Sequence, residues 1–300
     1  MKPDCLSGPL CLRAILIVFI SEVSSNHSQK IERALEFIDQ SAAAGCDAVK
    51  FQLFKVEQLF SREVLENMPE TLKRKEWELP LEFLPVLAKR CIEKKVQFGC
   101  TPFYLDAVDE LSEYVDFYKV ASYELLWDEL LISCVKTGKP LILSTGMATI
   151  DEIKHAVEVT RNNGCEDLTL LHCTSAYPTP YKEANLAAIE TLRSKFGCKV
   201  GWSDHTVNPG VISRAVNRWG AEVIEFHLDL EGDGAEFESG HCWLPNDIAP
   251  VIKQLKHGSI ADGDGVKKPV TSEMPDRKWR ADPSDGLRPL KPTRDTLLKK

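Results

Sequence analysis

Two histidines stand where short apolar runs of the chain stop, and together they suggest a shared metal ion. They are His205 and His227. If the two runs are neighbouring strands, both imidazoles lie at the same end of a sheet. A single buried histidine is more often part of a core, but this pair, with the carboxylates of Glu22 and Glu236 available, favours a metal site. Imidazole and oxygen ligands suit Mn²⁺ or Mg²⁺ acting as a Lewis acid.

Two lysines, Lys50 and Lys119, lie inside or just beyond apolar runs. An ammonium group there is costly unless it meets an anion. Hydroxyl side chains follow other runs, and with the lysines they would form a cradle for phosphate and carboxylate groups. These hydroxyl residues are Ser122, Ser144, Thr145 and Ser203. Two other interpretations stay open: a structural Lys–Glu pair inside the fold, or a lysine that forms a Schiff base.

Three further residues, Tyr177, His172 and His27, also lie at or just past the ends of apolar runs. Pro178 and Pro180 stiffen the segment that carries Tyr177, which would present its ring and hydroxyl from a rigid platform. The alternative for this tyrosine is an ordinary place on a surface loop. His172 is expected to be structural, and His27 fits either a structural or a functional role.

Eight short apolar runs must position these residues. The runs are continuous rather than alternating, as in parallel strands covered on both faces. Helical patterns separate most of them, which predicts an α/β fold, a (β/α)8 TIM barrel whose chemistry lies past the strands' carboxyl ends. A doubly wound sheet would normally carry a Gly-rich turn after its first strand, and none is present. The runs are Ile15–Ile20, Ala48–Phe51, Val96–Cys100, Phe117–Ala121, Pro140–Leu143, Leu168–His172, Lys199–Trp202 and Glu222–Phe226.

The barrel is predicted to span residues 1–257, and a polar C-terminal arm without a domain of its own to span residues 258–300. The charged stretch Lys55–Pro80 is expected to form a loop or lid after the second strand. Thr149 is expected to cap a helix that ends at Gly164. The helical patterns cover Ile31–Ala44, Leu81–Lys94, Ile150–Asn163, Asn185–Phe196 and Gly210–Trp219.

Composition excludes several classes of protein. The 300 residues carry a net charge of −8, and no sustained Lys/Arg block precedes the tail, so nucleic acid is not an expected partner. No segment approaches the roughly 20 apolar residues that span a membrane. The run Leu12–Ile20 fits a buried strand better than a signal peptide. Ten cysteines without a C-x-x-C pair indicate reduced thiols in a cytoplasmic protein.

The strand-end segments, taken in order, resemble the N-acetylneuraminate (sialic acid) synthase family. The resemblance runs from about Val18 to Leu255, and eight motifs in one order are highly specific. They are Ser21-Glu22-Val23 with Asn26-His27, Asp47-Ala48-Val49-Lys50-Phe51-Gln52, Thr101-Pro102-Phe103, Lys119-Val120-Ala121-Ser122 with Glu124, Ser144-Thr145-Gly146-Met147, Leu171-His172-Cys173-Thr174-Ser175 with Tyr177-Pro178-Thr179-Pro180, Ser203-Asp204-His205-Thr206, and Glu225 with His227.

The resemblance implies condensation of phosphoenolpyruvate with an N-acylated amino sugar, such as N-acetylmannosamine, to a nonulosonic acid and phosphate. It implies a phosphoenolpyruvate cradle of Lys50, Lys119, Ser122, Ser144 and Ser203. It implies metal ligands His205 and His227, with Glu22 supporting the metal-bound water or the sugar. It implies a pocket for the acyl sugar formed by Gln52, Thr101, Glu124, Ser175 and Tyr177. Glu236 stands where the family usually has an aspartate, and a homodimer is expected.

The chain also departs from the family pattern. Typical members carry a C-terminal antifreeze-like domain, whose arginine reaches the partner's active site, and the tail of residues 258–300 is not expected to form such a domain. We hypothesise that Arg280 or Arg288 supplies that guanidinium. Ser24 and Tyr123 replace usual glycines, and Tyr123 is expected to reshape the sugar pocket. The stretch Ser239–Pro245 differs from the usual ending.

Two alternatives to a synthase follow from the same residues. One is a Schiff-base pyruvate or sugar aldolase acting at Lys50 or Lys119. The other is a barrel that binds a sugar or an anion without catalysis. The complete set of lysines, histidines and carboxylates argues against the second, because a site that had lost its activity would be expected to lose some of them.

Overall fold

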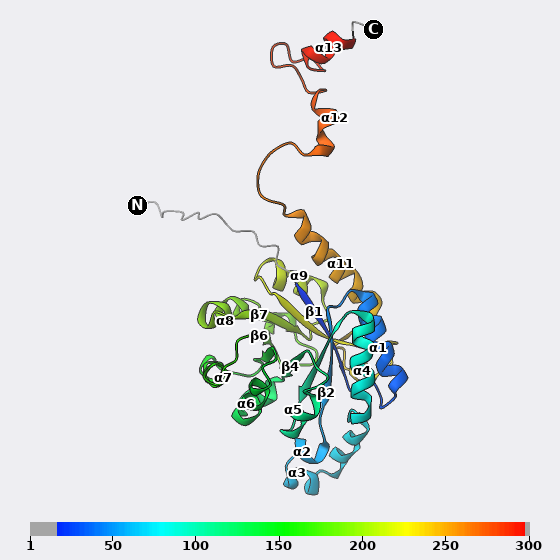
Figure 1. Cartoon of the computed structure of the whole chain (residues 1–300), viewed down its shortest axis with the longest axis vertical. Helices are drawn as coiled ribbons and strands as arrows, with labels where there is room; N and C mark the ends of the chain where they lie inside the picture. The colour runs from blue at the N-terminus through cyan, green and yellow to red at the C-terminus, as the bar shows by residue number, and fades with distance from the viewer. Residues whose placement is uncertain (1–16, 298–300) are drawn as a thin grey trace, which may run out of the picture. The chain divides into compact units, whose positions relative to one another are not determined.

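Eight parallel strands follow one another around a closed barrel in the computed structural model, which describes residues 17–297 (Figure 1). Each strand pairs with the next along the chain, and β1 pairs with β8 to close the sheet. The predicted (β/α)8 fold is confirmed. The strands are β1 Val18–Ser24, β2 Ala48–Leu53, β3 Gln97–Pro102, β4 Phe117–Val120, β5 Leu141–Ser144, β6 Leu168–Cys173, β7 Lys199–Asp204 and β8 Val223–Leu228. A short ninth strand, β9 Cys242–Trp243, pairs with β8.

The strands are buried on both faces, which explains their continuous apolar sequences. One large core lies between the sheet and the helices, and a smaller buried cluster takes one residue from each of six strands. The smaller set alternates in position with the larger, as the interior of a barrel does. Its members are Ile20, Ala48, Phe117, Ile142, Leu171 and Val223.

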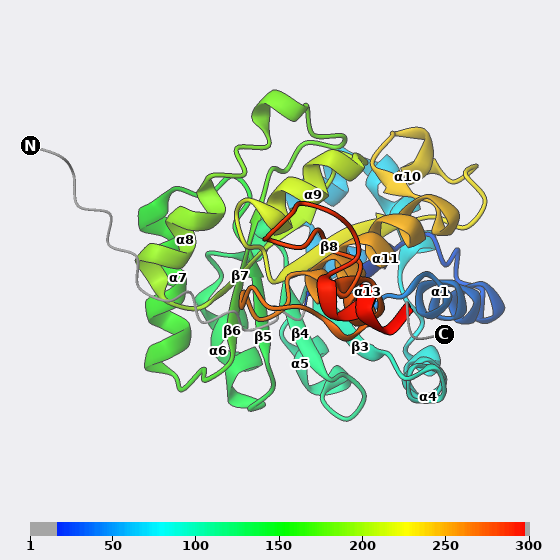
Figure 2. The same cartoon turned by 90° about the horizontal axis from the view of Figure 1, so that it is seen from above.

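Helices flank the strands (Figures 1 and 2). α1 has the predicted bounds, and Gly45 ends it in the left-handed conformation, at φ 93°. Thr149 caps α7 as predicted, in a reciprocal capping box with Glu152. The helices that follow strands β1 to β8 and the segment after β2 are α1 Ile31–Ala44, α4 Leu84–Lys94, α5 Asp106–Leu111, α6 Asp128–Lys136, α7 Ile150–Asn162, α8 Ala188–Phe196, α9 Pro209–Asn217 and α11 Pro245–Ala261.

Several boundaries differ from the predicted ones. β1 continues through Ser24, four residues beyond the predicted end, and the first two residues of the predicted run lie outside the described residues. α8 begins at Ala188 rather than at residue 185. The stretch Lys55–Pro80 follows β2 as expected, but most of it is helical. It contains α2 Val56–Leu59, α3 Arg62–Asn67 and the 3-10 helix η1 Pro69–Trp77.

The described chain divides into two units, the barrel up to Ser259 and a segment from Ile260. Within that segment lie η5 Thr271–Glu273, α12 Met274–Arg277 and α13 Lys291–Leu297. Asp282 organises the turn before α13, because its carboxylate accepts bonds from Ser284 and from the backbone N–H of Lys291. The division of the chain at residue 257 stays a prediction.

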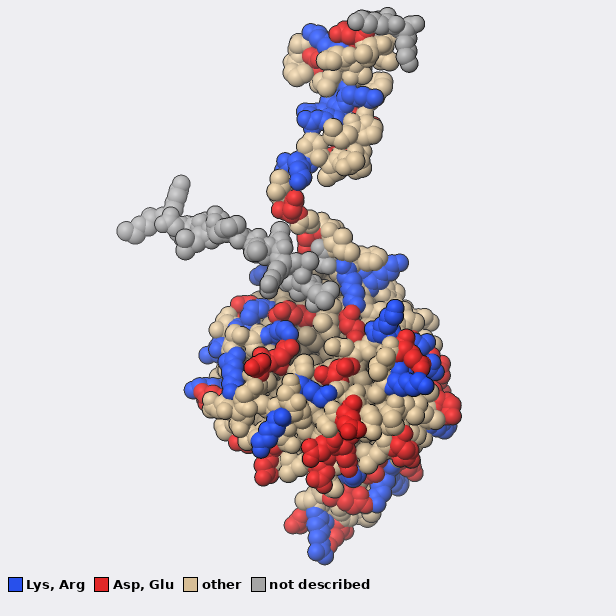
Figure 3. All heavy atoms as spheres, in the orientation of Figure 1, with Lys and Arg blue, Asp and Glu red and all other residues tan. Residues whose placement is uncertain are grey.

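The eight cysteines of the described chain are free thiols, and six of them are buried. Cys5 and Cys11 lie outside the described residues. Lys and Arg side chains are interspersed with Asp and Glu over the barrel face seen in Figure 3. Among the helices of residues 17–297, none combines the length and the apolar character needed to cross a bilayer.

Candidate active site

The strand register brings charged residues of several strands to the carboxyl end of the barrel. Glu22 of β1 lies opposite Lys50 of β2 on one side and opposite His227 of β8 on the other. Ser203 of β7 lies opposite Glu225 of β8. Residues that are far apart in sequence therefore share one rim, where the active sites of such barrels lie.

Two lysines and two glutamates form a buried charge cluster at this rim. Lys50 Nζ contacts Glu22 and lies 4.0 Å from Glu225 Oε2, while Lys119 Nζ lies 3.7 Å from Glu225 Oε1. Lys50 also donates to Thr101 Oγ1, at 3.1 Å. The Lys–Glu pairing that was one alternative is thus present, and it places both ammonium groups together. Thr101, which was predicted for the sugar pocket, is thus a hydrogen-bond partner of Lys50 in this cluster.

Burial and neighbouring charges act in opposition on this cluster. Burial lowers the pKa of Lys50 to about 8, although the carboxylate of Glu225 opposes the shift. Burial alone would raise the pKa of Glu225, but Lys119, Lys50, His227 and the hydrogen bond from Ser203 together outweigh it, and the net shift is downward. Ser203 adds a hydroxyl bond to Glu225 Oε1, at 3.1 Å. Sequence analysis gave Glu225 no role, although a carboxylate inside an apolar run was the available indication.

Hydroxyl groups from three segments gather around Gly146. Ser122 Oγ accepts the backbone N–H of Gly146 at 2.9 Å. A Cβ on Gly146 would overlap Ser175 Oγ and would lie 2.8 Å from Ser122 Oγ, so only glycine leaves room for both hydroxyls. The side-chain oxygens of Ser144 and Ser175 are buried and have no hydrogen-bond partner among the described residues. Such groups are available to an anion.

The predicted metal histidines lie side by side. The ring centroids of His205 and His227 are 5.4 Å apart, and Tyr177 stacks on His205 at 4.2 Å. His205 Nδ1 lies 2.9 Å from the carbonyl of Thr174, so a proton on Nδ1 leaves Nε2 free as a ligand. Burial, and then the charge of His227, lower the pKa of His205 to about 3. A neutral imidazole is the form that binds metals.

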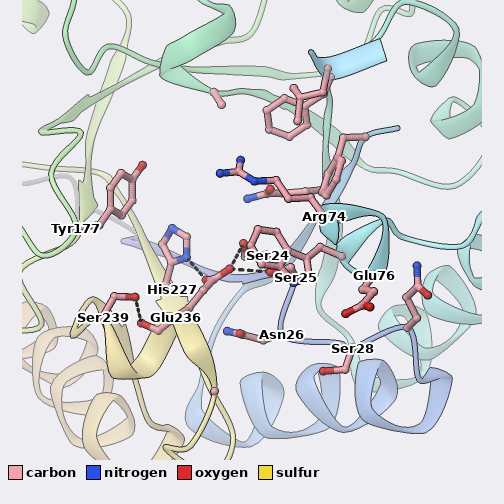
Figure 4. Close-up of a pocket in the computed structure, with 18 of the residues that line it drawn as sticks. Ser24, Ser25, Asn26, Ser28, Arg74, Glu76, Tyr177, His227, Glu236 and Ser239 are labelled. Carbon is pink, nitrogen blue, oxygen red and sulfur yellow. Dashed lines mark hydrogen bonds and ion pairs between the residues drawn. The ribbon is translucent and has the colours of Figure 1, made fainter. Parts of the chain in front are cut away.

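Glu236 joins this group from the short helix α10, Ala235–Glu238. Its Oε2 lies 3.0 Å from His227 Nδ1, and its Oε1 accepts hydroxyl bonds from Ser24 at 2.5 Å and Ser25 at 3.0 Å (Figure 4). Ser24 has φ 53°, the left-handed region that favours glycine, which explains why a glycine is usual at this position. Here the serine instead anchors Glu236. Burial opposes ionisation, but the hydrogen bond from His227 holds the pKa of Glu236 well below its ordinary value.

His241 and Cys242 complete the group, and sequence analysis assigned them no role. Ligand atoms of His227, Glu236, His241 and Cys242 all lie within 4.8 Å of one another. Imidazoles, a carboxylate and a thiol are metal ligands, and the donor set fits a divalent cation. The departure of residues 239–245 from the family pattern was the only sequence indication.

A cavity of about 1000 Å³ opens beside the histidines. Gln52, Tyr123, Glu124, Tyr177, His227 and Glu236 line it, whereas Thr101 and Ser175, also predicted for the sugar pocket, are not among its lining residues. Tyr177 is 43% exposed, so it meets both the cavity and the solvent. The described atoms leave Glu124 Oε2 without a hydrogen-bond partner, and burial raises the pKa of this carboxyl to about 7.

The segment after β2 supplies another wall of this cavity. Arg74 of η1 lines the cavity and points toward its interior in Figure 4. Its guanidinium lies 5.2 Å from the ring centroid of Phe60 and 5.5 Å from that of Trp77. Both aromatic rings therefore hold the cation in place over the opening.

The remaining two histidines of the sequence analysis are structural in their contacts. His172 lies 2.9 Å from the carbonyl of Ala184 and packs on Trp202, and burial lowers its pKa. His27 accepts the backbone N–H of Gln29 at 3.0 Å, and burial lowers its pKa to about 4. Neither belongs to the histidine cluster.

The fold defines a (β/α)8 enzyme, and its rim combines paired ammonium groups with a cluster of imidazole, carboxylate and thiol side chains. Residues 37–267 match the NeuB family, and the chain belongs to that family, as the strand-end motifs predicted. It is a synthase-type enzyme. The roles of the individual site residues stay predictions.

Relatives and solved structures agree with this assignment. The chain is 34% identical to N,N'-diacetyllegionaminic acid synthase of Campylobacter jejuni, covering 86% of this chain and 80% of that protein. It is 31% identical to pseudaminic acid synthase of Helicobacter pylori, covering 82% and 75%. The crystal structure of N-acetylneuraminic acid synthetase from Leptospira borgpetersenii, in complex with citrate, superposes with a TM-score of 0.77 at 30% identity, covering 90% and 93%.

Proposed function

We propose that this enzyme condenses phosphoenolpyruvate with an N-acylated amino sugar, N-acetylmannosamine or a related hexosamine, to give a nonulosonic acid and phosphate. The observation that carries the proposal is that a buried lysine pair and a histidine–glutamate cluster share one rim of the barrel, beside a cavity that His227 and Glu236 line. The printed names of the relatives, synthases of legionaminic and pseudaminic acids, support the same chemistry.

In the proposed reaction, C3 of phosphoenolpyruvate attacks the aldehyde carbon of the open-chain sugar and forms the new C–C bond. The aldehyde oxygen takes up a proton and becomes a hydroxyl. Water then adds to the electron-poor C2 and loses a proton, and cleavage of the C2–O bond releases inorganic phosphate. A divalent cation at the site would polarise the aldehyde oxygen.

The chain's own residues would position the two substrates. Lys50 and Lys119 lie where their ammonium groups can hold the phosphate and carboxylate of the enol ester, because charge-assisted bonds of this kind are strong. The unpartnered hydroxyls of Ser144 and Ser175 add donors beside them. Fixing both reactants in one orientation lowers the entropic part of the barrier.

The residues toward the cavity would hold the sugar and the cation. Gln52 lines the cavity and donates to Glu22 Oε1 at 2.9 Å, so the buried carboxylate would orient the amide toward the sugar. His205, His227 and Glu236 would hold the cation, which the sequence predicts to be Mn²⁺ or Mg²⁺. Tyr177 covers the histidines and would shield the reacting carbonyl from bulk water.

The test is release of inorganic phosphate from phosphoenolpyruvate with a panel of N-acyl hexosamines, each with Mn²⁺ or Mg²⁺. We expect sugar-dependent phosphate release that EDTA abolishes and added metal restores. His205→Ala should lose the activity, whereas the surface variant His155→Ala should keep it. Absence of phosphate release with every sugar and every divalent metal would favour a binding protein over a synthase.

A Schiff-base aldolase is the second candidate, and the lowered pKa of Lys50 favours it. Its contact with Glu22 favours the ammonium form, however, whereas formation of a Schiff base needs the neutral amine. Borohydride reduction in the presence of pyruvate would trap and inactivate an aldolase. The proposed synthase should retain its phosphate release after the same treatment.

A further inference from the structure

The strand β9 brings a second pair of metal-ligand side chains to the histidine cluster. β9 pairs with β8 so that Cys242 lies opposite His227, and His241 directly precedes it. The ring centroids of His227 and His241 are 4.8 Å apart. The stretch Ser239–Pro245, which departs from the family pattern, thus returns to the rim of the barrel rather than leaving it.

One ring nitrogen of His241 has no partner among the described residues, and the other faces Glu236. His241 is only 6% exposed. Its Nδ1 is buried without a hydrogen-bond partner in the described chain, and its Nε2 pairs with Glu236 Oε2 at 3.7 Å. A buried ring nitrogen without a hydrogen-bond partner is costly, because it has lost its hydration without a replacement. A bound cation would remove that cost.

Cys242 is also buried close to Glu236. It is 2% exposed, and its Sγ lies 3.9 Å from Glu236 Oε2. Ligands of one tetrahedral ion, with bonds of about 2.0–2.3 Å, stand roughly 3–4 Å from one another. The four ligand atoms of His227, Glu236, His241 and Cys242 lie within 4.8 Å of one another, so small side-chain movements would bring them around one cation.

We infer that His241 and Cys242 bind the metal ion together with His227 and Glu236. The resulting set holds two imidazoles, one carboxylate and one thiolate. A thiolate is a soft ligand that favours Zn²⁺, Co²⁺ or Fe²⁺ and disfavours Mg²⁺. The inference rests on the metal site of the proposed function, but it puts His241 and Cys242 in the place of His205 as ligands, and it replaces the expected Mn²⁺ or Mg²⁺ with a borderline ion.

The experiment measures metal binding without substrate. The full-length protein is stripped with a chelator and titrated with Co²⁺, Zn²⁺, Mn²⁺ and Mg²⁺ in a calorimeter, and the Co²⁺ form is recorded by absorption. We expect Zn²⁺ and Co²⁺ to bind at least tenfold tighter than Mg²⁺. We also expect a near-ultraviolet thiolate-to-cobalt charge-transfer band from the wild-type protein, which needs no variant to be seen.

Variants then assign the ligands. Cys242→Ser and Cys242→Ala should both lose the charge-transfer band, and His241→Gln should bind Co²⁺ at least tenfold more weakly, since even outer-shell partners contribute 10- to 100-fold. Cys165→Ser and His155→Gln are controls on a half-buried thiol and an exposed imidazole, and they should behave as wild type. Circular dichroism checks that each variant is folded.

Three outcomes would overturn the inference: no Co²⁺ binding, a wild-type Co²⁺ form without the band, or a folded His241→Gln protein with wild-type affinity. These outcomes are distinguishable from a failure of the proposed function. Phosphate release with unchanged Cys242→Ser spectra would remove the inference and leave the synthase. Thiolate-ligated metal without phosphate release would do the reverse.

Discussion

The buried charges at the rim are balanced in number, since two ammonium groups meet two carboxylates. Lys50 and Lys119 are each less than 4% exposed, and Glu225 lies between them. Breaking a buried pair leaves an uncompensated charge, which is strongly destabilising. The cluster therefore keeps both ammonium groups in place before an anionic substrate arrives.

Lys119→Met should raise the KM for phosphoenolpyruvate more than it raises the KM for the sugar. Loss of one charge-assisted hydrogen bond corresponds to about 1.5–3 kcal/mol, so the KM for phosphoenolpyruvate should rise roughly 10- to 100-fold. Steady-state kinetics with each substrate varied measures this. Lys154→Met, an exposed lysine on α7, is the matched control. An unchanged KM for phosphoenolpyruvate in a folded Lys119→Met protein would contradict the cradle.

Glu124 should make the stability of the protein depend on pH. Its pKa is about 7 in the folded chain against an ordinary value of 4.5, so the folded state holds its proton more tightly. Stability from this group is complete below pH 4.5 and is lost as the pH rises to 7. At about 1.4 kcal/mol per pKa unit, the cost above pH 7 is at most about 3 kcal/mol.

Glu124→Gln removes this titration. The variant should therefore gain free energy of unfolding relative to wild type as the pH is raised from 4.5 to 7.5, in urea titrations at each pH. Glu129→Gln, on the exposed surface of α6, should run parallel to wild type. Parallel curves for Glu124→Gln as well would show that its carboxyl titrates normally.

The candidate site residues that lie within or beside apolar runs could be predicted from the sequence, because burying a lysine or histidine there costs free energy unless the side chain has a partner. His241 could not be found in this way. It follows His227 by a loop and the short helix α10, and only the pairing of β9 with β8 returns it to the rim. Glu225 sits in a predicted strand, but its partners on β2 and β4 are set by the closure of the barrel.

At the scale of elements, all eight strands could be predicted, because burial on both faces makes their sequences continuously apolar. The end of β1 could not. Ser21, Glu22 and Ser24 are polar, but they continue the strand because each finds a partner inside the fold, as Ser21 does with Ser41 at 2.7 Å. The short helices of the segment after β2 carry too little periodicity to be recognised.

The turn after β5 should be sensitive to a single methyl group. Gly146→Ala would push the hydroxyls of Ser122 and Ser175 aside. Serine side chains can rotate away, so the fold should survive, but the Gly146 N–H bond to Ser122 and the arrangement of donors would be lost. The KM for phosphoenolpyruvate should rise at least about tenfold, the effect of one hydrogen bond.

Gly258→Ala is the control for this substitution, because a Cβ there meets nothing within 4 Å. It should leave both Michaelis constants unchanged. Thermal unfolding of Gly146→Ala distinguishes a loss of activity caused by displaced hydroxyls from one caused by loss of the folded protein. A melting temperature close to wild type with a raised KM supports displaced hydroxyls, and a collapsed melting temperature with an unchanged KM for the remaining folded protein speaks against them.

At the scale of the whole molecule, the barrel contains the lysine pair, the histidine cluster and the cavity, and the segment from Ile260 is a separate unit. The homodimer expected from the family resemblance stays a prediction, as do the cytoplasmic location and the arm. Within the segment, Arg294 is occupied, since its guanidinium pairs with both carboxylate oxygens of Asp285 at 3.0 and 2.8 Å.

The hypothesis about the tail arginines is tested by kinetics. Arg280 and Arg288 are exposed, and the described chain gives neither a carboxylate partner. A planar guanidinium binds carboxylate and acyl oxygens through two hydrogen bonds, so an arginine that binds the sugar must not already be paired with a carboxylate. If one of them serves this role, its alanine variant should raise the KM for the sugar about tenfold, or about 1.4 kcal/mol, and leave the KM for phosphoenolpyruvate unchanged. Arg218→Ala, on the barrel, is the control, and unchanged kinetics for both Arg280→Ala and Arg288→Ala would remove the hypothesis.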